Sequence, residues 1–80
     1  MRALIVDDED LARAVLRELL AAHPEVEIGG EAGNGFEAVK LAEELAADLL
    51  FLDIQMPKLS GFEVMELVGE KIAVVFVTAY

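Results

Sequence analysis

Continuous apolar runs separated by amphipathic segments are the main pattern of this chain. Residues 3–6, 49–52 and 73–77 are uninterrupted aliphatic and aromatic runs, which is typical of interior parallel strands covered on both faces. Residues 26–31 instead alternate polar with small or apolar side chains, which predicts an edge strand. The sequence therefore predicts four strands, one of them at the edge of the sheet.

The first segment between these runs has helical periodicity and ends at His23 and Pro24. Because its apolar residues recur every three or four positions, one side is expected to face the sheet and the charged side to face away. The apolar side consists of Leu11, Val15, Leu16 and Leu19, and the charged side consists of Arg13, Arg17 and Glu18.

Two further helical segments follow. Asn34 is placed to cap the second, which is expected to extend to about residues 46–47, and the third is expected over Gly61–Val68. The predicted inward residues are Phe36, Val39, Leu41 and Ala42 in the second segment and Phe62, Met65 and Val68 in the third. Short strand–helix repeats predict right-handed crossovers and an open parallel α/β sheet, in which ligands bind at the carboxyl ends of the strands.

Acidic side chains follow two of the apolar runs. Asp7 and Asp8 come after residues 3–6, and Asp53 comes after residues 49–52, so parallel strands would bring the three carboxylates to one end of the sheet. Two carboxylates about 4–5 Å apart repel by roughly 3–4 kcal/mol at an effective dielectric near 20. Such a cluster favours a raised pKa or a bound hard cation such as Mg²⁺, beside which Asp53 can act as a nucleophile toward phosphorus.

Simpler explanations apply to some of these residues. Acids near a helix N-terminus complement the helix dipole, and we favour this interpretation for Glu9 and Asp10 but not for Asp7 and Asp8. The residues alone leave two interpretations of Thr78 open. Its hydroxyl could cap the strand by a local hydrogen bond, or it could have a functional role. Neither a GxGxxG nor a GxxxxGK[ST] loop follows any strand, so no nucleotide site is expected.

Composition narrows the classes of function. The chain has 80 residues and a net charge of −10, which argues against direct nucleic-acid binding, because duplex affinity comes chiefly from Lys and Arg. No apolar run approaches the roughly 20 residues that span a bilayer, and the N-terminus is not a signal peptide, so a cytoplasmic protein without membrane contact is expected. There is no cysteine, which excludes disulfides and thiolate metal sites.

These residues together resemble the receiver domains of two-component response regulators. The resemblance covers the whole chain and rests on the Asp7–Asp8 pair, on Phe-Leu-Asp-Ile-Gln-Met-Pro at 51–57 and on Val-Phe-Val-Thr-Ala-Tyr at 75–80. The last two stretches are most similar to receivers joined to LytTR-type DNA-binding domains. The resemblance implies a flavodoxin-like (CheY-like) three-layer α/β/α fold with strand order 2-1-3-4.

The resemblance also implies a role for particular residues. Asp53 would be the phosphoacceptor and the Thr78 hydroxyl would contact the phosphoryl group, while Mg²⁺ would be held by Asp7, Asp8, Asp53 and the main-chain carbonyl of Gln55. The implied partner is a sensor histidine kinase, and the implied output is transcription control through a DNA-binding effector domain outside this chain. No enzyme is expected, because an aspartate-dependent phosphatase needs a second Asp where this sequence has Gln55.

The family has five strands and five helices, so residues 1–80 are expected to be an incomplete receiver domain, truncated after the fourth strand and without the family's strand-five lysine. An alternative function follows from that expectation. An uncovered apolar edge strand at residues 74–77 favours self-association, so the chain would be an interaction module that forms a homodimer or a higher oligomer without phosphotransfer.

Overall fold

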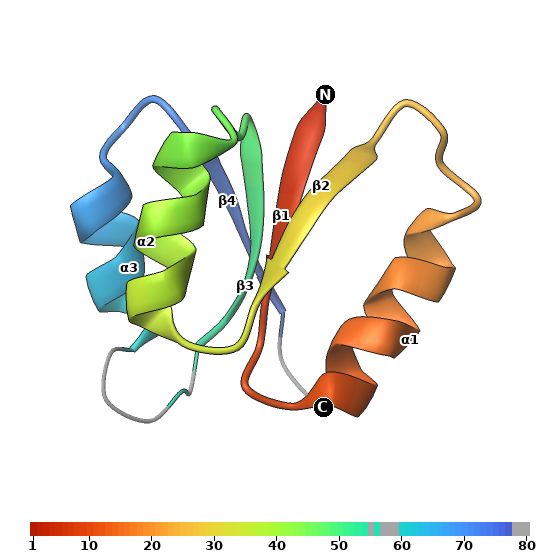
Figure 1. Ribbon diagram of the computed structural model, residues 1–80, viewed down its shortest axis with the longest axis horizontal. Helices are drawn as coiled ribbons and strands as arrows, with labels where there is room; N and C mark the ends of the chain where they lie inside the picture. Colours follow the sequence, from red (N-terminus) through yellow and green to blue (C-terminus); the bar gives the residue numbers. More distant parts are fainter. Residues whose placement is uncertain (55, 57–59, 78–80) are drawn as a thin grey trace.

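The computed structural model describes residues 1–54, 56 and 60–77. They form a four-stranded parallel sheet in the order β2-β1-β3-β4, with helices on both faces (Figure 1). The strands are β1 (Arg2–Val6), β2 (Glu27–Ala32), β3 (Leu49–Asp53) and β4 (Ala73–Val77), and the helices are α1 (Asp10–Leu20), α2 (Gly35–Glu44) and α3 (Gly61–Val68). The predicted three-layer α/β/α fold and its strand order are confirmed.

Helices α2 and α3 lie on one face of the sheet and α1 lies on the other (Figure 1). The alternation of side chains along β1 and β3 sends Leu4, Val6, Leu50 and Leu52 into a core shared with the two helices. In the described part of the chain the longest helix has 11 residues, and no helix there combines the length and apolar character that crossing a membrane requires.

Element boundaries differ slightly from the predicted ones. Strand β2 is shifted by one residue, and α2 ends at Glu44 rather than near residues 46–47. Helix α2 ends early because Ala46 adopts a positive φ of 51°, a left-handed conformation that terminates helices. At the other end of α2 the predicted cap is confirmed, since the Asn34 Oδ1 accepts a hydrogen bond from the Glu37 amide at 2.8 Å.

The apolar side of α1 lines a groove over the sheet, as predicted, but most of it is exposed. Leu11, Val15 and Leu19 are 76%, 51% and 64% exposed, whereas Leu16 is half-buried. Arg13, which was expected to face away, has a side chain only 16% exposed. The apolar side chains are exposed because the groove between α1 and the sheet is open. Only the position predicted for Arg13 is wrong, because its guanidinium turns toward the carboxylates of Asp10 and Glu31.

The inward sides of α2 and α3 are also partly mispredicted. Phe36, Phe62 and Met65 are exposed, although the Phe62 ring lies 5.1 Å from the ring of Phe76 on the edge strand β4. Val64 is the fully buried side chain of α3. The other predicted inward residues are confirmed, since Ala42 lies in the core and Val39, Leu41 and Val68 pack against it.

Candidate functional site

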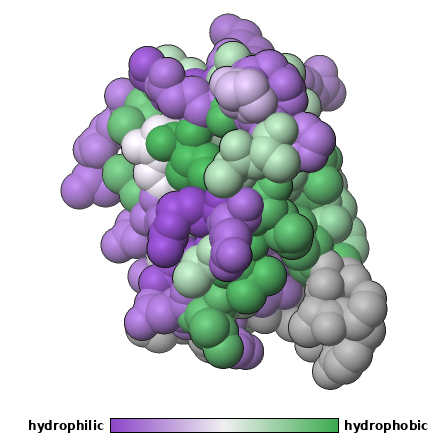
Figure 2. Space-filling model, turned by 90° about the vertical axis from the view of Figure 1, so that its right-hand side faces the viewer, coloured by the Kyte–Doolittle hydropathy of each residue, from purple (hydrophilic) through white to green (hydrophobic). Residues whose placement is uncertain are grey.

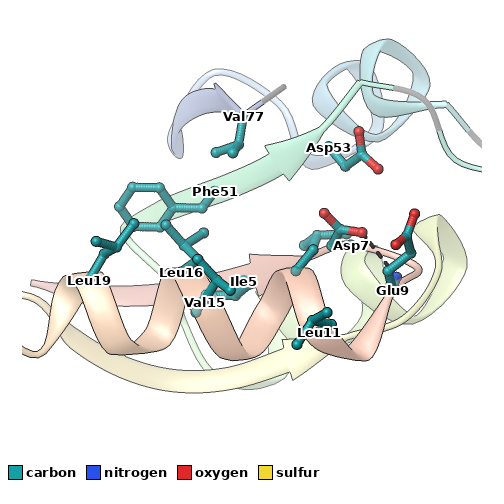
Figure 3. A pocket seen from close by; sticks show the side chains of 12 residues that line it. Ile5, Asp7, Glu9, Leu11, Val15, Leu16, Leu19, Phe51, Asp53 and Val77 are labelled. Atoms are coloured by element: carbon teal, nitrogen blue, oxygen red, sulfur yellow. Dashed lines mark hydrogen bonds between the residues drawn. The ribbon is translucent and has the colours of Figure 1, made fainter. Parts of the chain in front are cut away.

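Three carboxylates meet at the carboxyl ends of β1 and β3. The pairing of Val6 with Leu52 brings the two strand ends side by side, with Asp53 as the last residue of β3 and Asp7 and Asp8 directly after β1. One carboxylate oxygen from each of the three residues lies within 4.8 Å of the others. The Asp7 and Asp53 side chains point toward one another (Figure 3). The structure thus brings together the acids that the sequence places at two strand ends.

The backbone around Asp7 is held by hydrogen bonds. Its amide donates to the carbonyl of Ala32 at 3.1 Å, which ties the first loop residue to the end of β2. Its Oδ1 accepts a hydrogen bond from the amide of Glu9 at 3.0 Å (Figure 3), the local pattern that lets Asp stabilise a tight turn. The Asp7 carboxylate is therefore fixed at the carboxyl end of the sheet, whereas Asp8 is exposed.

Burial raises the pKa of Asp7 above its ordinary value of 3.8, and repulsion from Asp53, Asp8 and Glu9 raises it further, against the hydrogen bond from the Glu9 amide. A raised pKa means that the cluster favours neutralisation by a proton or by a cation. Clustered carboxylate oxygens that are partly open to solvent suit Mg²⁺, which binds a few hard oxygen ligands and keeps other positions for water or phosphate. The donor set present here therefore fits a magnesium ion.

Gly61 supports Asp53 from the side of α3. A Cβ at Gly61 would lie 2.6 Å from the Asp53 carbonyl oxygen and 3.0 Å from the Cα of Ile54, and the Gly61 amide donates to the Ile54 carbonyl at 3.1 Å. Any larger residue would push the peptide after Asp53 outward. From the sequence we predicted only that a helix starts at Gly61. The one sequence signal for the close contact was a glycine directly after Ser60, a residue that can cap a helix.

Arg13 is a second residue whose position sequence reasoning missed. Its Nη1 donates to the Asp7 carbonyl at 2.5 Å, its Nε lies 3.3 Å from Glu31 Oε1, and its Nη2 pairs with Asp10. The arginine therefore joins the loop after β1 to α1 and to β2. The available sequence signal was an Asp three residues before an Arg, which is the spacing of a helical ion pair.

A groove of about 460 Å³ separates α1 from the sheet. Its acidic end is formed by Asp7, Glu9 and Asp53, and the remainder is lined mainly by apolar side chains (Figure 3). Viewed from the α1 side, hydrophobic surface is visible among hydrophilic residues (Figure 2). The acids thus lie at one end of an open, largely apolar groove.

Two of the predicted site residues, Gln55 and Thr78, lie outside the described residues. The roles expected of them, a main-chain metal ligand and a phosphoryl contact, stay predictions. The described part of the site consists of the three carboxylates with their supporting glycine, arginine and main-chain hydrogen bonds.

A parallel sheet in the order 2-1-3-4 with an acidic cluster at its carboxyl end defines the class of protein. The sequence profile of the response regulator receiver domain matches residues 3–80. The chain belongs to this family, the receiver domains of two-component systems. Whether it is of the LytTR type stays a prediction.

Individual proteins agree with this assignment. The chain is 45% identical over 82 aligned residues to the transcriptional regulatory protein BtsR of Salmonella typhi, covering 100% of this chain and 34% of that one. The response regulator domain of Thermotoga maritima CheB superposes with a TM-score of 0.90 at 36% identity, over 99% of this chain and 60% of that one. A chain of the CheX–CheY–BeF3–Mg²⁺ complex from Borrelia burgdorferi superposes with a TM-score of 0.89 at 26% identity, over 100% of this chain and 63% of that one. This chain spans about a third of the length of the curated relatives it matches.

Proposed function

We propose that this chain accepts a phosphoryl group on Asp53 from the phosphohistidine of a sensor histidine kinase, with Mg²⁺ held by Asp7, Asp8, Asp53 and the carbonyl of Gln55. The observation that carries the proposal is the approach of three carboxylates to within 4.8 Å at the strand ends of a receiver domain. The similar CheX–CheY complex contains Mg²⁺, which supports the choice of cation.

The transfer step follows from the position of Asp53. One of its carboxylate oxygens attacks the phosphorus atom, a P–O bond forms, and the P–N bond to the kinase histidine breaks with its electron pair on the imidazole nitrogen. When bound, Mg²⁺ neutralises charge on the acids and on the phosphoryl oxygens. Asp7 is held in place by the main-chain hydrogen bonds at its amide and carboxylate, and the Thr78 hydroxyl donates to the phosphoryl group. Hydrolysis of the acyl phosphate returns the chain to its starting state.

The biological output belongs to a longer protein in this proposal. Residues 1–80 act as part of a receiver domain, since they cover 60% of the CheB response regulator domain, and a DNA-binding effector domain controls transcription, as the name of BtsR suggests. The chain is a phosphoacceptor rather than an enzyme, and its place is the cytoplasm, where the kinase donor is found. Its net charge of −10 leaves DNA contact to the effector domain.

Incubation with acetyl phosphate and Mg²⁺, followed by intact-mass measurement, tests the proposal. We expect a gain of one phosphoryl group that disappears when Mg²⁺ is chelated and in the variant Asp53→Asn, which keeps the size of the side chain but lacks the nucleophilic carboxylate. An unmodified wild-type chain that is folded by circular dichroism would contradict the proposal.

Self-association without phosphotransfer is the second candidate. It is favoured by the position of β4 at an edge of the described sheet and by the exposed Val75 on that strand, because exposed apolar edges pair with other chains. Light scattering at micromolar concentration should then show a dimer or larger species that Val75→Lys converts to a monomer. A monomeric wild-type chain would exclude this candidate.

A further inference from the structure

We infer that Arg13 is a positioning residue for the metal site: its guanidinium fixes the peptide between Asp7 and Asp8, so that both acids are directed toward Asp53 before a cation binds. The inference rests on the metal site of the proposed function. It assigns to a helix residue outside the acidic cluster the task of arranging that cluster.

The contacts of Arg13 come from three parts of the fold. Its Nη1 donates to the Asp7 carbonyl at 2.5 Å, its Nε lies 3.3 Å from a Glu31 oxygen at the end of β2, and its Nη2 pairs with Asp10 at the start of α1. With only 16% of the side chain exposed, these contacts are more shielded from water than an ordinary surface ion pair. A planar guanidinium held at three points has little freedom to turn.

A fixed carbonyl at Asp7 has consequences for both acids. Because the peptide unit is planar, the direction of that carbonyl also sets the amide of Asp8 and the Cα positions on either side. The preceding peptide is held independently, since the Asp7 amide donates to the Ala32 carbonyl at 3.1 Å. Arg13 therefore completes the restraint on the segment that carries two of the three carboxylates.

This restraint opposes the electrostatic repulsion among the three carboxylates. Asp7, Asp8 and Asp53 repel one another, and a flexible loop would relieve that repulsion by moving its carboxylates apart. A loop that is already held closed loses less conformational freedom when a cation binds, so the cation binds more tightly. The positive charge of Arg13 does little to repel the cation, because Asp10 and Glu31 pair with it.

The direction in which loss of Arg13 changes the affinity for a divalent cation distinguishes positioning from a purely electrostatic effect of its charge. If Arg13 acted only through its charge, its removal would make the site more negative and strengthen divalent-cation binding. If it positions the loop, its removal weakens binding.

Arg17 is a matched control on the same helix, because it carries the same charge, pairs with the other oxygen of Glu31 and is 52% exposed. Within the described residues its side chain makes no hydrogen bond to residues 7 or 8.

The experiment is a titration of the full chain with Mg²⁺, followed through the amide resonances of Asp8 and Asp53 by NMR. Arg13→Gln should weaken Mg²⁺ binding about tenfold, the lower end of the range for residues that orient metal ligands, while Arg17→Gln should change it by less than about twofold. Arg13→Lys keeps the charge but loses the fork geometry, so it should resemble Arg13→Gln. It also provides the test if the glutamine variant does not fold.

A second measurement needs no metal. In chelator, hydrogen exchange at the amides of Asp8 and Glu9 should be faster in Arg13→Gln than in the wild type and in Arg17→Gln, because the loop has lost its restraint. Unchanged or tighter Mg²⁺ binding in Arg13→Gln, or wild-type binding in Arg13→Lys, would overturn the inference. If the wild type does not bind Mg²⁺ at all, the proposed function fails, and unchanged exchange rates in Arg13→Gln would separately overturn the positioning role.

Discussion

The face of the sheet covered by α2 and α3 is packed, whereas the face covered by α1 is open. On the first face Leu4, Leu50 and Leu52 have no exposed surface and join a continuous core that includes Val64 of α3. On the second face a groove of about 460 Å³ lies between α1 and the strands. The same strands thus have a dense apolar contact on one side and a loose one on the other.

The difference originates in the helices. Helix α2 presents Ala38 and Ala42 to the core, and small side chains allow a helix to approach a sheet closely. Helix α1 buries none of its residues fully and is joined to the remainder of the fold partly through the ion pairs of Arg13 and Arg17 with Glu31. Stability is therefore expected to come mainly from the packed face, while the open face holds the acidic end of the groove.

The largest expected effect is the contrast between two leucines. Leu52→Ala removes a fully buried side chain from the packed face and should lower the free energy of unfolding by about 2–5 kcal/mol. Leu19→Ala, the same change on the open face, should lower it by less than about 0.5 kcal/mol. Urea unfolding monitored by circular dichroism compares the two. Equal losses would mean that α1 is packed against apolar surface in solution, and the comparison of the faces would be wrong.

A smaller effect is expected where α3 abuts the site. Gly61→Ala places a methyl group 2.6 Å from the Asp53 carbonyl oxygen, and such overpacking costs about 1–3 kcal/mol. The amide resonances of residues 53 and 54 should shift at the same time. In the control Gly33→Ala the new Cβ would lie 3.5 Å from Arg13 Nη1, an ordinary contact, so its stability should be close to that of the wild type. An unperturbed Gly61→Ala variant would contradict the close approach.

The pH dependence of stability tests the acidic end of the open face. Since the pKa of Asp7 is raised by burial and by its acidic neighbours, the folded state binds a proton more readily than the unfolded state. Its contribution to stability is present below the ordinary value of 3.8 and is lost as the pH rises through the folded pKa.

Asp7→Asn keeps an Oδ1 acceptor for the Glu9 amide but has no charge to lose. In chelator this variant should therefore be more stable than the wild type at pH 7, and the advantage should vanish as the pH falls below 3.8. Urea unfolding of both proteins across this range measures the difference. A difference that does not vary with pH would show that ionisation of Asp7 does not affect stability.

The smallest effect is expected for the exposed apolar residues of α1. Leu11→Gln preserves helix propensity and replaces a side chain that is 76% exposed, so the free energy of unfolding should change by less than about 0.5 kcal/mol. Fluorescence of a hydrophobic dye should decrease, because the variant removes apolar surface from the open face. Unchanged dye fluorescence would indicate that the dye does not bind beside α1.

The sequence was sufficient to predict the strands and the meeting of the acids, because apolar runs that end in Asp carry that information directly. The capping box of Ser60 and Glu63 was also readable as a Ser followed by a Glu three positions later, although it was not predicted. The burial of the Arg13 side chain was not predictable from the periodicity of α1. It depends on Arg13 meeting a main-chain carbonyl and Glu31, and a main-chain acceptor leaves no trace in the residue types. The contact of Gly61 with Asp53 is likewise made between backbones.

Strand β1 lies between β2 and β3, although it precedes both of them in the sequence. On the ribosome it can pair with β2 as soon as Ala32 has emerged, whereas its other neighbour follows only when residues 49–53 are free. Asp7 and Asp8 therefore repel only their acidic sequence neighbours at first, and the repulsion from Asp53 is added when β3 pairs with β1. We expect the second strand pairing to be the step of folding that responds most to salt and to divalent cations, because it completes the cluster of three carboxylates.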